Sequence, residues 1–162
     1  MKLDIKIVFS QKENKMKISS GTCIIFKNKI LFCHPTNSSW IGTFSPAKGG
    51  VDEGETKLEA AIRETKEEIG VTITSEMILD VDNPIEIKYL NKKKYTHKIV
   101  YLYVVKINSL SEIGLESEIV PKKQLQISEV DWAGFLSAED IKEKGFHRFF
   151  PLLDLLETDF VV

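Results

Sequence analysis

The sequence has few cysteines, no long apolar run and almost no net charge. Its two cysteines, Cys23 and Cys33, lie in or beside strand-like segments without a CxxC spacing. This favours reduced core thiols in a cytoplasmic protein, with a disulfide as the alternative. No apolar run approaches the roughly 18 residues that span a bilayer, and the N-terminus MKLDIKIVFS lacks the layout of a signal peptide, so we expect no membrane partner. A net charge of −2 argues against a broad electrostatic surface for nucleic acid.

What the chain does contain is the composition of an ordinary soluble globule. Hydrophobic residues make up 43% and charged residues 28% of its 162 positions. Neither internal repeats nor low-complexity linkers are present. This length suits a single domain, residues 1–162, with its own core, and composition leaves monomer and homodimer equally open.

One stretch, residues 49–71 (GGVDEGETKLEAAIRETKEEIGV), carries the strongest chemical signal. A glycine-punctuated turn leads into residues 57–69, whose periodicity predicts a helix. At about 100° per residue, Glu64, Glu67 and Glu68 share one arc of that helix. The expected core-facing arc and the terminating glycine comprise Leu58, Ala61, Ile62, Thr65, Ile69 and Gly70. Adjacent carboxylates repel one another, but a hard cation such as Mg²⁺ or Mn²⁺ binds carboxylate oxygens and retains water for a phosphate substrate, so we predict a metal site here.

The spacing of this stretch resembles the Nudix box of the Nudix hydrolases. Gly49, five residues, Glu55, seven residues and then RETKEEIGV (63–71) supply every charged and glycine position of that pattern. Thr65 is a departure, because the family usually has an aliphatic residue there. The alternative is an acidic amphipathic helix after a glycine turn, with no ligand.

This resemblance implies roles for the residues of the box. The implied metal ligands are Gly49, through its carbonyl, and Glu64, Glu67 and Glu68. Arg63, also assigned to the catalytic group, is expected to pair with the box carboxylates and hold them in place. Glu55 is expected to orient the loop or Arg63 rather than touch the metal.

The residues before the box resemble one branch of the family, the asymmetrical diadenosine tetraphosphate hydrolases. That branch typically has a Pro-x-Lys-Gly run, here beginning at Pro46, and often the same Arg-Glu-Thr-x-Glu-Glu core, which accounts for Thr65. Lys48 is then a cation beside an acidic site, where a substrate phosphate needs a partner; the alternative is a solvated loop lysine. Phe44 stands where the branch commonly places an aromatic residue that binds substrate.

A second region, residues 85–105, is a candidate for substrate recognition. Residues 85–90 and 97–105 are predicted strands. The basic residues between and within them are Lys88, Lys92, Lys93, Lys94, His97 and Lys98, with Tyr89 and Tyr95 interleaved. The hairpin either faces polyphosphate and stacks a base, or is a solvated lysine-rich turn that prevents edge pairing. By resemblance to the same branch, Tyr89 and Tyr101 match positions near the adenine, and His97 matches a phosphate-contacting position.

The remaining segments predict an α+β fold with a mixed sheet flanked by helices, which the family resemblance refines to an α/β/α sandwich. Further strands are expected over 3–10, 21–26, 30–33, 77–82 and 126–132, with a short one over 40–44. Ser137 is expected to cap a helix to about Lys144, and a second helix is expected over 147–157. We expect His34 to be a surface or loop histidine rather than a ligand.

The predicted chemistry is hydrolysis of a phosphoanhydride by water, with Mg²⁺ or Mn²⁺ neutralising the oxygens. By resemblance, the favoured substrate is diadenosine tetraphosphate, cleaved to ATP and AMP. A 5′-RNA pyrophosphohydrolase, an ADP-ribose or nucleotide-sugar hydrolase and a non-catalytic nucleotide sensor are the alternatives. Many family members carry a later glutamate where this chain has Gln126, so Glu129, Glu118, Glu116 or none could supply a fourth carboxylate.

Overall fold

A computed structural model describes residues 16–157, so the strand expected over 3–10 lies outside the described residues. Within them, the strands are β1 Lys17–Phe26, β2 Lys29–Pro35, β3 Lys48–Gly50, β4 Ile85–Leu90, β5 Thr96–Lys106 and β6 Val130–Leu136. The α-helices described are α2 Lys57–Ile69 and α3 Ala138–Lys144. The 3₁₀-helices are η1 Ser75–Met77, η2 Leu110–Ile113, η3 Lys122–Gln124 and η4 His147–Leu155.

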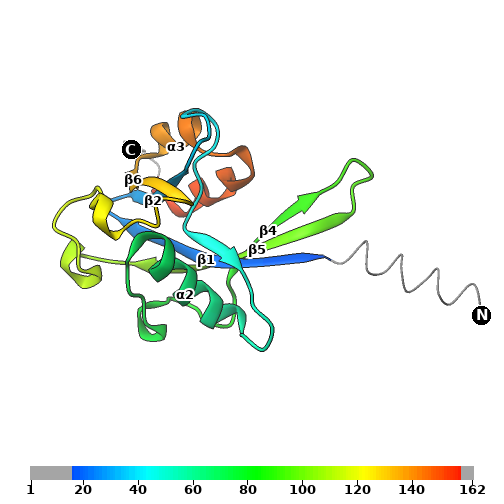
Figure 1. Cartoon of the computed structure of the whole chain (residues 1–162), viewed down its shortest axis with the longest axis horizontal. Coiled ribbons are helices and arrows are strands. Elements are labelled where there is room, and N and C mark those ends of the chain that lie inside the picture. Colours follow the sequence, from blue (N-terminus) through cyan, green and yellow to red (C-terminus); the bar gives the residue numbers. More distant parts are fainter. Residues whose placement is uncertain (1–15, 158–162) are drawn as a thin grey trace, which may run out of the picture.

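The strands form one mixed sheet in the order β4-β5-β1-β2-β6, with β3 paired to β1 off this path. β1 is long enough to serve two neighbours along one edge. Its first half pairs with β3, where Ser19 lies opposite Gly50, and its end turns through Lys27 and Asn28 into antiparallel β2. β1 and β5 run parallel, and the other pairs are antiparallel. The predicted α+β fold class is confirmed (Figure 1).

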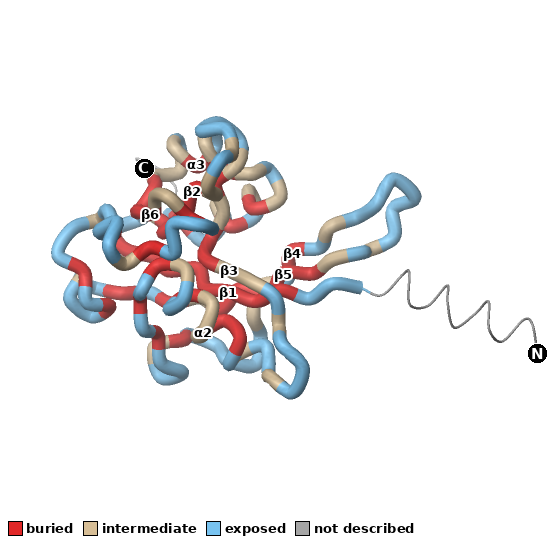
Figure 2. Tube along the Cα trace, viewed as in Figure 1, coloured by how far each residue is buried: buried red, intermediate tan, exposed pale blue. Residues whose placement is uncertain are grey.

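Helices cover both faces of this sheet (Figure 1). The face under α2 has a buried cluster that includes Ile24, Leu31, Cys33, Ala61, Ile69, Tyr103 and Val105. The face under α3 and η4 has a second cluster that includes Cys23, Phe32, Phe44, Leu102, Ile141, Phe149 and Leu152. Figure 2 shows the buried residues gathered between these layers and the tip of the β4–β5 hairpin exposed. Over residues 16–157, no helix has the length and apolar character needed to cross a membrane.

Helix α2 begins and ends where the sequence predicts. The Thr56 hydroxyl accepts a hydrogen bond from the Glu59 N–H, and the Glu59 carboxylate accepts one from the Thr56 N–H, which makes a capping box. Gly70 ends the helix with φ 67°, a left-handed conformation that suits glycine. Thr65 is fully buried, and its hydroxyl bonds to the Thr22 hydroxyl of β1 at 2.8 Å, so a polar residue is partnered at a position inside the core.

Four predicted elements differ in the structure. Residues 40–44 form no strand, and Phe44 and Ser45 make only isolated bridges to neighbouring segments. Residues 77–82 follow the short helix η1, and Ile78 bridges to β5 without extending into a strand. The last strand begins at Val130 because residues 126–129 form a turn closed by hydrogen bonds to the Gln126 carbonyl. The C-terminal helix is a 3₁₀-helix with Pro151 inside it, while α3 has the predicted Ser137 cap.

His34 is buried, with 1% of its surface exposed, so the expectation of a surface histidine is wrong. The residue belongs to β2, which ends one residue later at Pro35. Cys23 and Cys33 are free and buried, as the preferred interpretation of the sequence expected. Burial raises the pKa of the Cys23 thiol to about 12, which keeps it protonated and unreactive.

Candidate functional site

Arg63 is the centre of the ionic network in the glycine turn and helix α2. Its Nε and Nη2 atoms donate to the Glu55 carboxylate at 2.7 and 2.9 Å, and Nη2 donates to the Gly50 carbonyl at 2.9 Å. Its Nη1 atom donates to Glu64 at 2.9 Å and to Glu67 at 3.1 Å. These hydrogen bonds lower the pKa of Glu55 to about 2 and raise that of Arg63. Arg63 thus fixes the turn against the helix and holds two carboxylates of the box.

Glu64 lies against Gly49 so closely that a side chain at that position would collide with it. A Cβ atom on Gly49 would lie 2.1 Å from the Glu64 carboxyl group. Burial is the largest effect on Glu64 and raises its pKa in spite of Arg63. Glycine at position 49 therefore allows the backbone of β3 to approach a partly desolvated carboxylate.

Glu68 is a strongly perturbed carboxylate of the site. Burial is the main reason that its pKa is raised to about 7, and the charges of Glu64 and Glu129 raise it further. Its Oε2 atom accepts a hydrogen bond from the Lys48 N–H at 3.3 Å, and the Lys48 charge acts in the opposite direction. Such an environment disfavours the ionised form of the carboxylate, and a bound cation would favour it.

The donor set of this face fits a hard divalent cation. Such cations take carboxylate and carbonyl oxygens, and Glu64, Glu67, Glu68 and the Gly49 carbonyl supply both kinds. In the described part of the chain, however, no three acidic, histidine or cysteine side chains converge on one point. For Glu64 and Glu67 the reason is Arg63. Its guanidinium bonds to both carboxylates and lies between them as a metal cation would.

The fourth carboxylate can now be sought among the three glutamates that the sequence left open. Glu118 pairs with Lys29 at 2.9 Å and is thus engaged elsewhere. Glu116 is exposed. Glu129 is exposed in the turn 126–129, and it is close enough to Glu68 to raise the pKa of that group. Of the three, Glu129 is therefore the glutamate whose charge affects a box carboxylate.

The opposite face of the sheet carries a group of aromatic and cationic side chains that we call the aromatic–cation cluster: Tyr89, Lys98, Phe146 and Arg148. The Tyr89 and Phe146 rings have centroids 6.2 Å apart and planes within 26° of parallel. The Arg148 guanidinium lies 4.6 Å and the Lys98 ammonium 5.1 Å from the Tyr89 ring centroid. Burial, followed by the charges of Lys48 and Lys17, lowers the pKa of Lys98.

The structure separates the other predicted substrate-binding residues. Tyr101 lies opposite Glu86 and Tyr89 lies opposite Lys98, so the two tyrosines point to opposite faces of the antiparallel pair. Tyr101 is buried on the α2 side, beneath the Lys57 ammonium at 4.1 Å. His97, after a bulge in the pairing, lies 6.4 Å from the Tyr89 ring.

Phe44 is 1% exposed and lies within the core beneath this face. Its ring packs 5.4 Å from Trp40 and 5.7 Å from Trp132, and its carbonyl accepts the Phe146 N–H. Phe44 therefore supports the cluster from below. The lysines at positions 92, 93 and 94 lie at the exposed tip of the hairpin, which extends away from the body (Figure 2).

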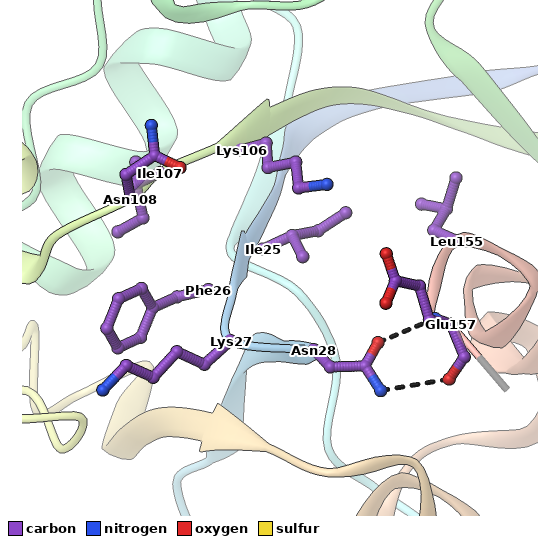
Figure 3. A pocket seen from close by; sticks show the side chains of 9 residues that line it. All are labelled: Ile25, Phe26, Lys27, Asn28, Lys106, Ile107, Asn108, Leu155 and Glu157. Atoms are coloured by element: carbon purple, nitrogen blue, oxygen red, sulfur yellow. Dashed lines mark hydrogen bonds between the residues drawn. The ribbon is translucent and has the colours of Figure 1, made fainter. Parts of the chain in front are cut away.

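A cavity of about 250 Å³ lies elsewhere in the fold. It is formed by the C-terminal ends of β1 and β5, the turn at Asn28 and the end of η4, and it includes neither box residues nor the aromatic–cation cluster. Asn28 spans its rim with two hydrogen bonds to the backbone of Glu157, at 2.7 and 3.0 Å (Figure 3). This cavity is a feature of the opposite end of β1 from Gly49 and is separate from the candidate site.

Sequence reasoning did not find Phe146 and Arg148. Phe146 belongs to an apolar run of the kind typical of a core, and Arg148 has no pattern around it. Both follow α3 in the chain and meet β4 only through the tertiary fold. No spacing within a single sequence links residues so far apart.

Comparison with known proteins agrees with the site. The family model described as NUDIX domain matches residues 16–154. The chain is 38% identical over 81 residues to the asymmetrical bis(5'-nucleosyl)-tetraphosphatase of Rattus norvegicus, covering 50% of this chain and 54% of that protein. It is 35% identical over 113 residues to the protein of the same name from Mus musculus, covering 69% and 75%. The alignment with the rat protein thus spans about half of that protein's length.

Solved structures give the same result. A C. elegans Ap4A hydrolase binary complex superposes with a TM-score of 0.60 at 27% identity, covering 86% of this chain and 93% of that one. A MutT NUDIX hydrolase from Burkholderia pseudomallei, at 17% identity and a TM-score of 0.63, covers 86% and 97% and shares the fold. The box, the sheet and these matches lead to one conclusion: the chain belongs to the Nudix hydrolase family.

Proposed function

We propose that this protein hydrolyses a phosphoanhydride bond of dinucleoside polyphosphates, with diadenosine tetraphosphate as the favoured substrate and ATP and AMP as the products. One observation carries the proposal. Lys48, in β3, donates its backbone N–H to the Glu68 carboxylate of α2, and its charge contributes, after burial, to the lowered pKa of Lys98 in the aromatic–cation cluster. A substrate with a base at one end and a chain of phosphates matches that arrangement.

The acidic side would hold a cation through residues of this chain. Glu64, Glu67, Glu68 and the Gly49 carbonyl would bind Mg²⁺ or Mn²⁺. When bound, such a cation neutralises phosphate oxygens and lowers the pKa of a coordinated water. Arg63 would then release its bonds to Glu64 and Glu67 while its two bonds to Glu55 keep it in place.

The attacking water needs a group that accepts its proton, and two carboxylates are candidates. Glu68 has a pKa of about 7, which is near the value that suits a general base at neutral pH. Glu129 is exposed in the adjacent turn. We assign proton acceptance to Glu129 when Glu68 holds a cation, since a carboxylate that donates its oxygens to a metal is a weaker base.

The aromatic–cation cluster would bind one nucleoside. Two stacking contacts of about 3.5 Å each require about 7 Å between flanking rings, and Tyr89 and Phe146 are 6.2 Å apart. A small outward movement of Phe146 would admit a base between them, with a stacking energy of about 1–3 kcal/mol per ring. Arg148, over the face of Tyr89, would turn toward phosphate as the base enters.

Three cations near this path suit a polyanion. In the described residues, Lys48, Lys98 and Arg148 make no ion pair with a carboxylate within 4.0 Å. Burial lowers the pKa of Lys98, and the charges of Lys48 and Lys17 lower it further, so an anion near Lys98 would favour its charged form. The names of the rat and mouse relatives and of the C. elegans structure support a substrate of this class.

A 5′-RNA pyrophosphohydrolase is the second candidate. The observation that favours it is the exposed run of lysines at the hairpin tip, residues 92–94, since an RNA chain beyond its 5′ phosphates would need such contacts. A short dinucleotide substrate has no use for them. A non-catalytic nucleotide sensor of the same fold would bind nucleotide without turnover, and the retention of every box glutamate argues against it.

The test incubates purified protein with diadenosine tetraphosphate and Mg²⁺, and in parallel with triphosphorylated and capped RNA. We expect ATP and AMP in equal amounts, no turnover after chelation of the metal, and loss of activity in Glu67→Gln. Glu143→Gln, an exposed acid on α3, is the matched control and should retain activity. Cleavage of RNA alone would favour the second candidate. Nucleotide binding without turnover of any substrate would leave the sensor.

A further inference from the structure

His34 is a buried titratable side chain that the proposed reaction does not use directly. Its ring stacks on Trp40, with centroids 3.8 Å apart and planes within 10°, and packs 5.0 Å from the Phe44 ring. Because 1% of the residue is exposed, water does not solvate its nitrogens. A buried polar atom without a partner is costly, so the neighbours of the two nitrogens define the state of the ring.

Both ring nitrogens have hydrogen-bond partners. Nε2 lies 3.1 Å from the Ser38 carbonyl oxygen and 3.1 Å from that of Ser39, and the Ser38 hydroxyl lies 3.5 Å away. Nδ1 lies 2.5 Å from Oδ1 of Asp131. His34 therefore joins Asp131 of β6 to the loop that follows β2.

A β-bulge directs Asp131 onto the ring. In the β2–β6 pair, His34 lies opposite Trp132 and Pro35 lies opposite Val130, so Asp131 is the extra residue between them. In a regular pairing, Asp131 would have a partner residue in β2, and its side chain would lie on the other face of the strand. A bulge re-aims the side chain that it inserts, and bulges are frequent next to active sites.

The segments around His34 and Asp131 are connected to the Nudix box by the turn 126–129. The Thr36 N–H donates to the Glu129 carbonyl at 3.0 Å, and the Thr36 hydroxyl donates to the Ile127 carbonyl at 2.6 Å. On the other side of the turn, the Gln126 N–H donates to the Glu68 carbonyl at 2.9 Å. The turn that carries Glu129 is therefore held between the end of α2 and the residues next to His34 and Asp131.

We propose that the hydrogen-bonded pair His34–Asp131 is a positioning device that holds the turn 126–129, and with it Glu129, near Glu68. This inference rests on the proposed function, in which Glu129 accepts the proton of the attacking water. The His34 ring also contacts the carbonyls of Ser38 and Ser39, so one side chain organises both segments. Because Glu129 acts in the chemical step, we expect loss of the pair to lower kcat more than it changes KM.

Kinetics of His34→Gln and Asp131→Asn test this role, with Asp154→Asn, an exposed acid on η4, as the control. Loss of a supporting partner of a catalytic group typically costs about 10- to 100-fold in activity. We expect kcat to fall by that factor in both variants, KM to stay within about threefold, and the control to match wild type. A variant that is folded, by thermal melting and circular dichroism, yet keeps the wild-type kcat would overturn the proposal. A rise in KM with constant kcat would also contradict it.

The contact between His34 and Asp131 has its own measurement, which needs no substrate. Ring ¹⁵N chemical shifts of histidine-labelled protein should show that Asp131→Asn alters the Nδ1 signal of His34 most, whereas the control Asp154→Asn leaves it unchanged. An Nδ1 signal that Asp131→Asn does not change would overturn the pair. If wild type hydrolyses no nucleotide, the proposed function fails, whereas the ¹⁵N result still decides whether the pair exists.

Discussion

The two sides of the candidate site are assembled in different ways. The acidic side comes from one continuous segment, in which a turn, a capped helix and a terminating glycine place Glu64, Glu67 and Glu68 by local geometry. The aromatic–cation cluster comes from β4, β5 and η4, which meet only when the sheet is complete. The first side can be recognised in a sequence because helical spacing encodes it, and the second cannot.

The two sides also differ in the sign of their buried charge. On the acidic side, burial raises the pKa of Glu64 and Glu68, which disfavours their ionised forms. On the other side, burial and Lys48 lower the pKa of Lys98, which disfavours its cation. A divalent cation complements the first side and a polyphosphate the second, so the substrate–metal complex would neutralise both. We therefore expect changes on the acidic side to affect chemistry and changes on the other side to affect binding.

The largest expected effect breaks the acidic side. Glu67→Gln keeps the shape of the side chain and removes a charge that the metal requires. By analogy with the removal of one electrostatic contact to a transition state, kcat should fall by about 10²–10³-fold with little change in KM. Steady-state kinetics on diadenosine tetraphosphate at saturating Mg²⁺ measure this. An effect on KM alone would assign Glu67 to substrate binding instead.

The second effect is the pH dependence of the metal-free protein. Glu68 has a pKa of about 7 when folded and 4.5 ordinarily, so the folded state keeps a proton that the unfolded chain releases. Stability should therefore fall as pH rises from about 4.5 to 7 and then level off, by a few kcal/mol at about 1.4 kcal/mol per pKa unit. Chemical denaturation across this range measures the slope.

Glu68→Gln is the control for that slope and should show a flatter profile between pH 4.5 and 7. Mg²⁺ should stabilise wild type at pH 8 more than it stabilises the variant. Glu55 acts in a different window, since Arg63 lowers its pKa to about 2: its stabilisation is complete above pH 4.5 and is lost as pH falls toward 2. A wild-type profile that is flat from pH 4.5 to 7 would mean that Glu68 is not desolvated.

The third effect breaks the aromatic–cation cluster. Tyr89→Ala removes one ring of the expected base site, and the loss of about 1–3 kcal/mol of stacking should raise KM by roughly 5- to 150-fold. Tyr89→Phe should stay near wild type because it keeps the ring. Tyr95→Ala, on an exposed tyrosine at the hairpin tip, is the matched control. Equal changes in KM for Tyr89→Ala and Tyr95→Ala would place the base elsewhere on the hairpin.

The smallest effect concerns the scaffold beneath the acidic side. Thr65→Val preserves the side-chain shape but leaves the buried Thr22 hydroxyl without its partner, so unfolding free energy should drop by about 1 kcal/mol. The activity should be unchanged, because Thr65 faces the core. The double variant Thr22→Val/Thr65→Val should recover part of the loss, since it removes both polar groups. A large loss of kcat in Thr65→Val would mean that the core threonine sets the helix position.

The elements that the sequence predicted best are those with a local cause. Helix α2 follows from its capping box and from Gly70, and the strands β4 and β5 follow from their β-branched and aromatic residues. Residues 126–129 read as a strand because Ile127 precedes an alternating run, but hydrogen bonds to the Gln126 carbonyl fold them into a turn. Such bonds depend on the end of α2, which no local pattern contains.

In the candidate site, too, the contacts with a local cause could be predicted from the sequence and the tertiary contacts could not. The contacts of Arg63 with Glu55, Glu64 and Glu67 have the spacing of a turn and a helix, and the box pattern indicated them. Tyr89 and Tyr101 were grouped by resemblance, but the pleat of the sheet separates them onto opposite faces. His34 was expected at the surface or in a loop. It lies in β2 instead, where Trp40 and Phe44 pack against its ring and Asp131, in the bulge of β6, bonds to it.

The most direct test of the central claim is a double-mutant cycle with Glu67→Gln and Tyr89→Ala on diadenosine tetraphosphate. The account predicts that Glu67→Gln lowers kcat, that Tyr89→Ala raises KM, and that the double variant combines both with changes in free energy additive within about 0.5 kcal/mol. Independent sites behave in this way. If both single variants changed the same kinetic parameter, or if the double variant were no worse than Glu67→Gln alone, the division between a chemical side and a binding side would be contradicted.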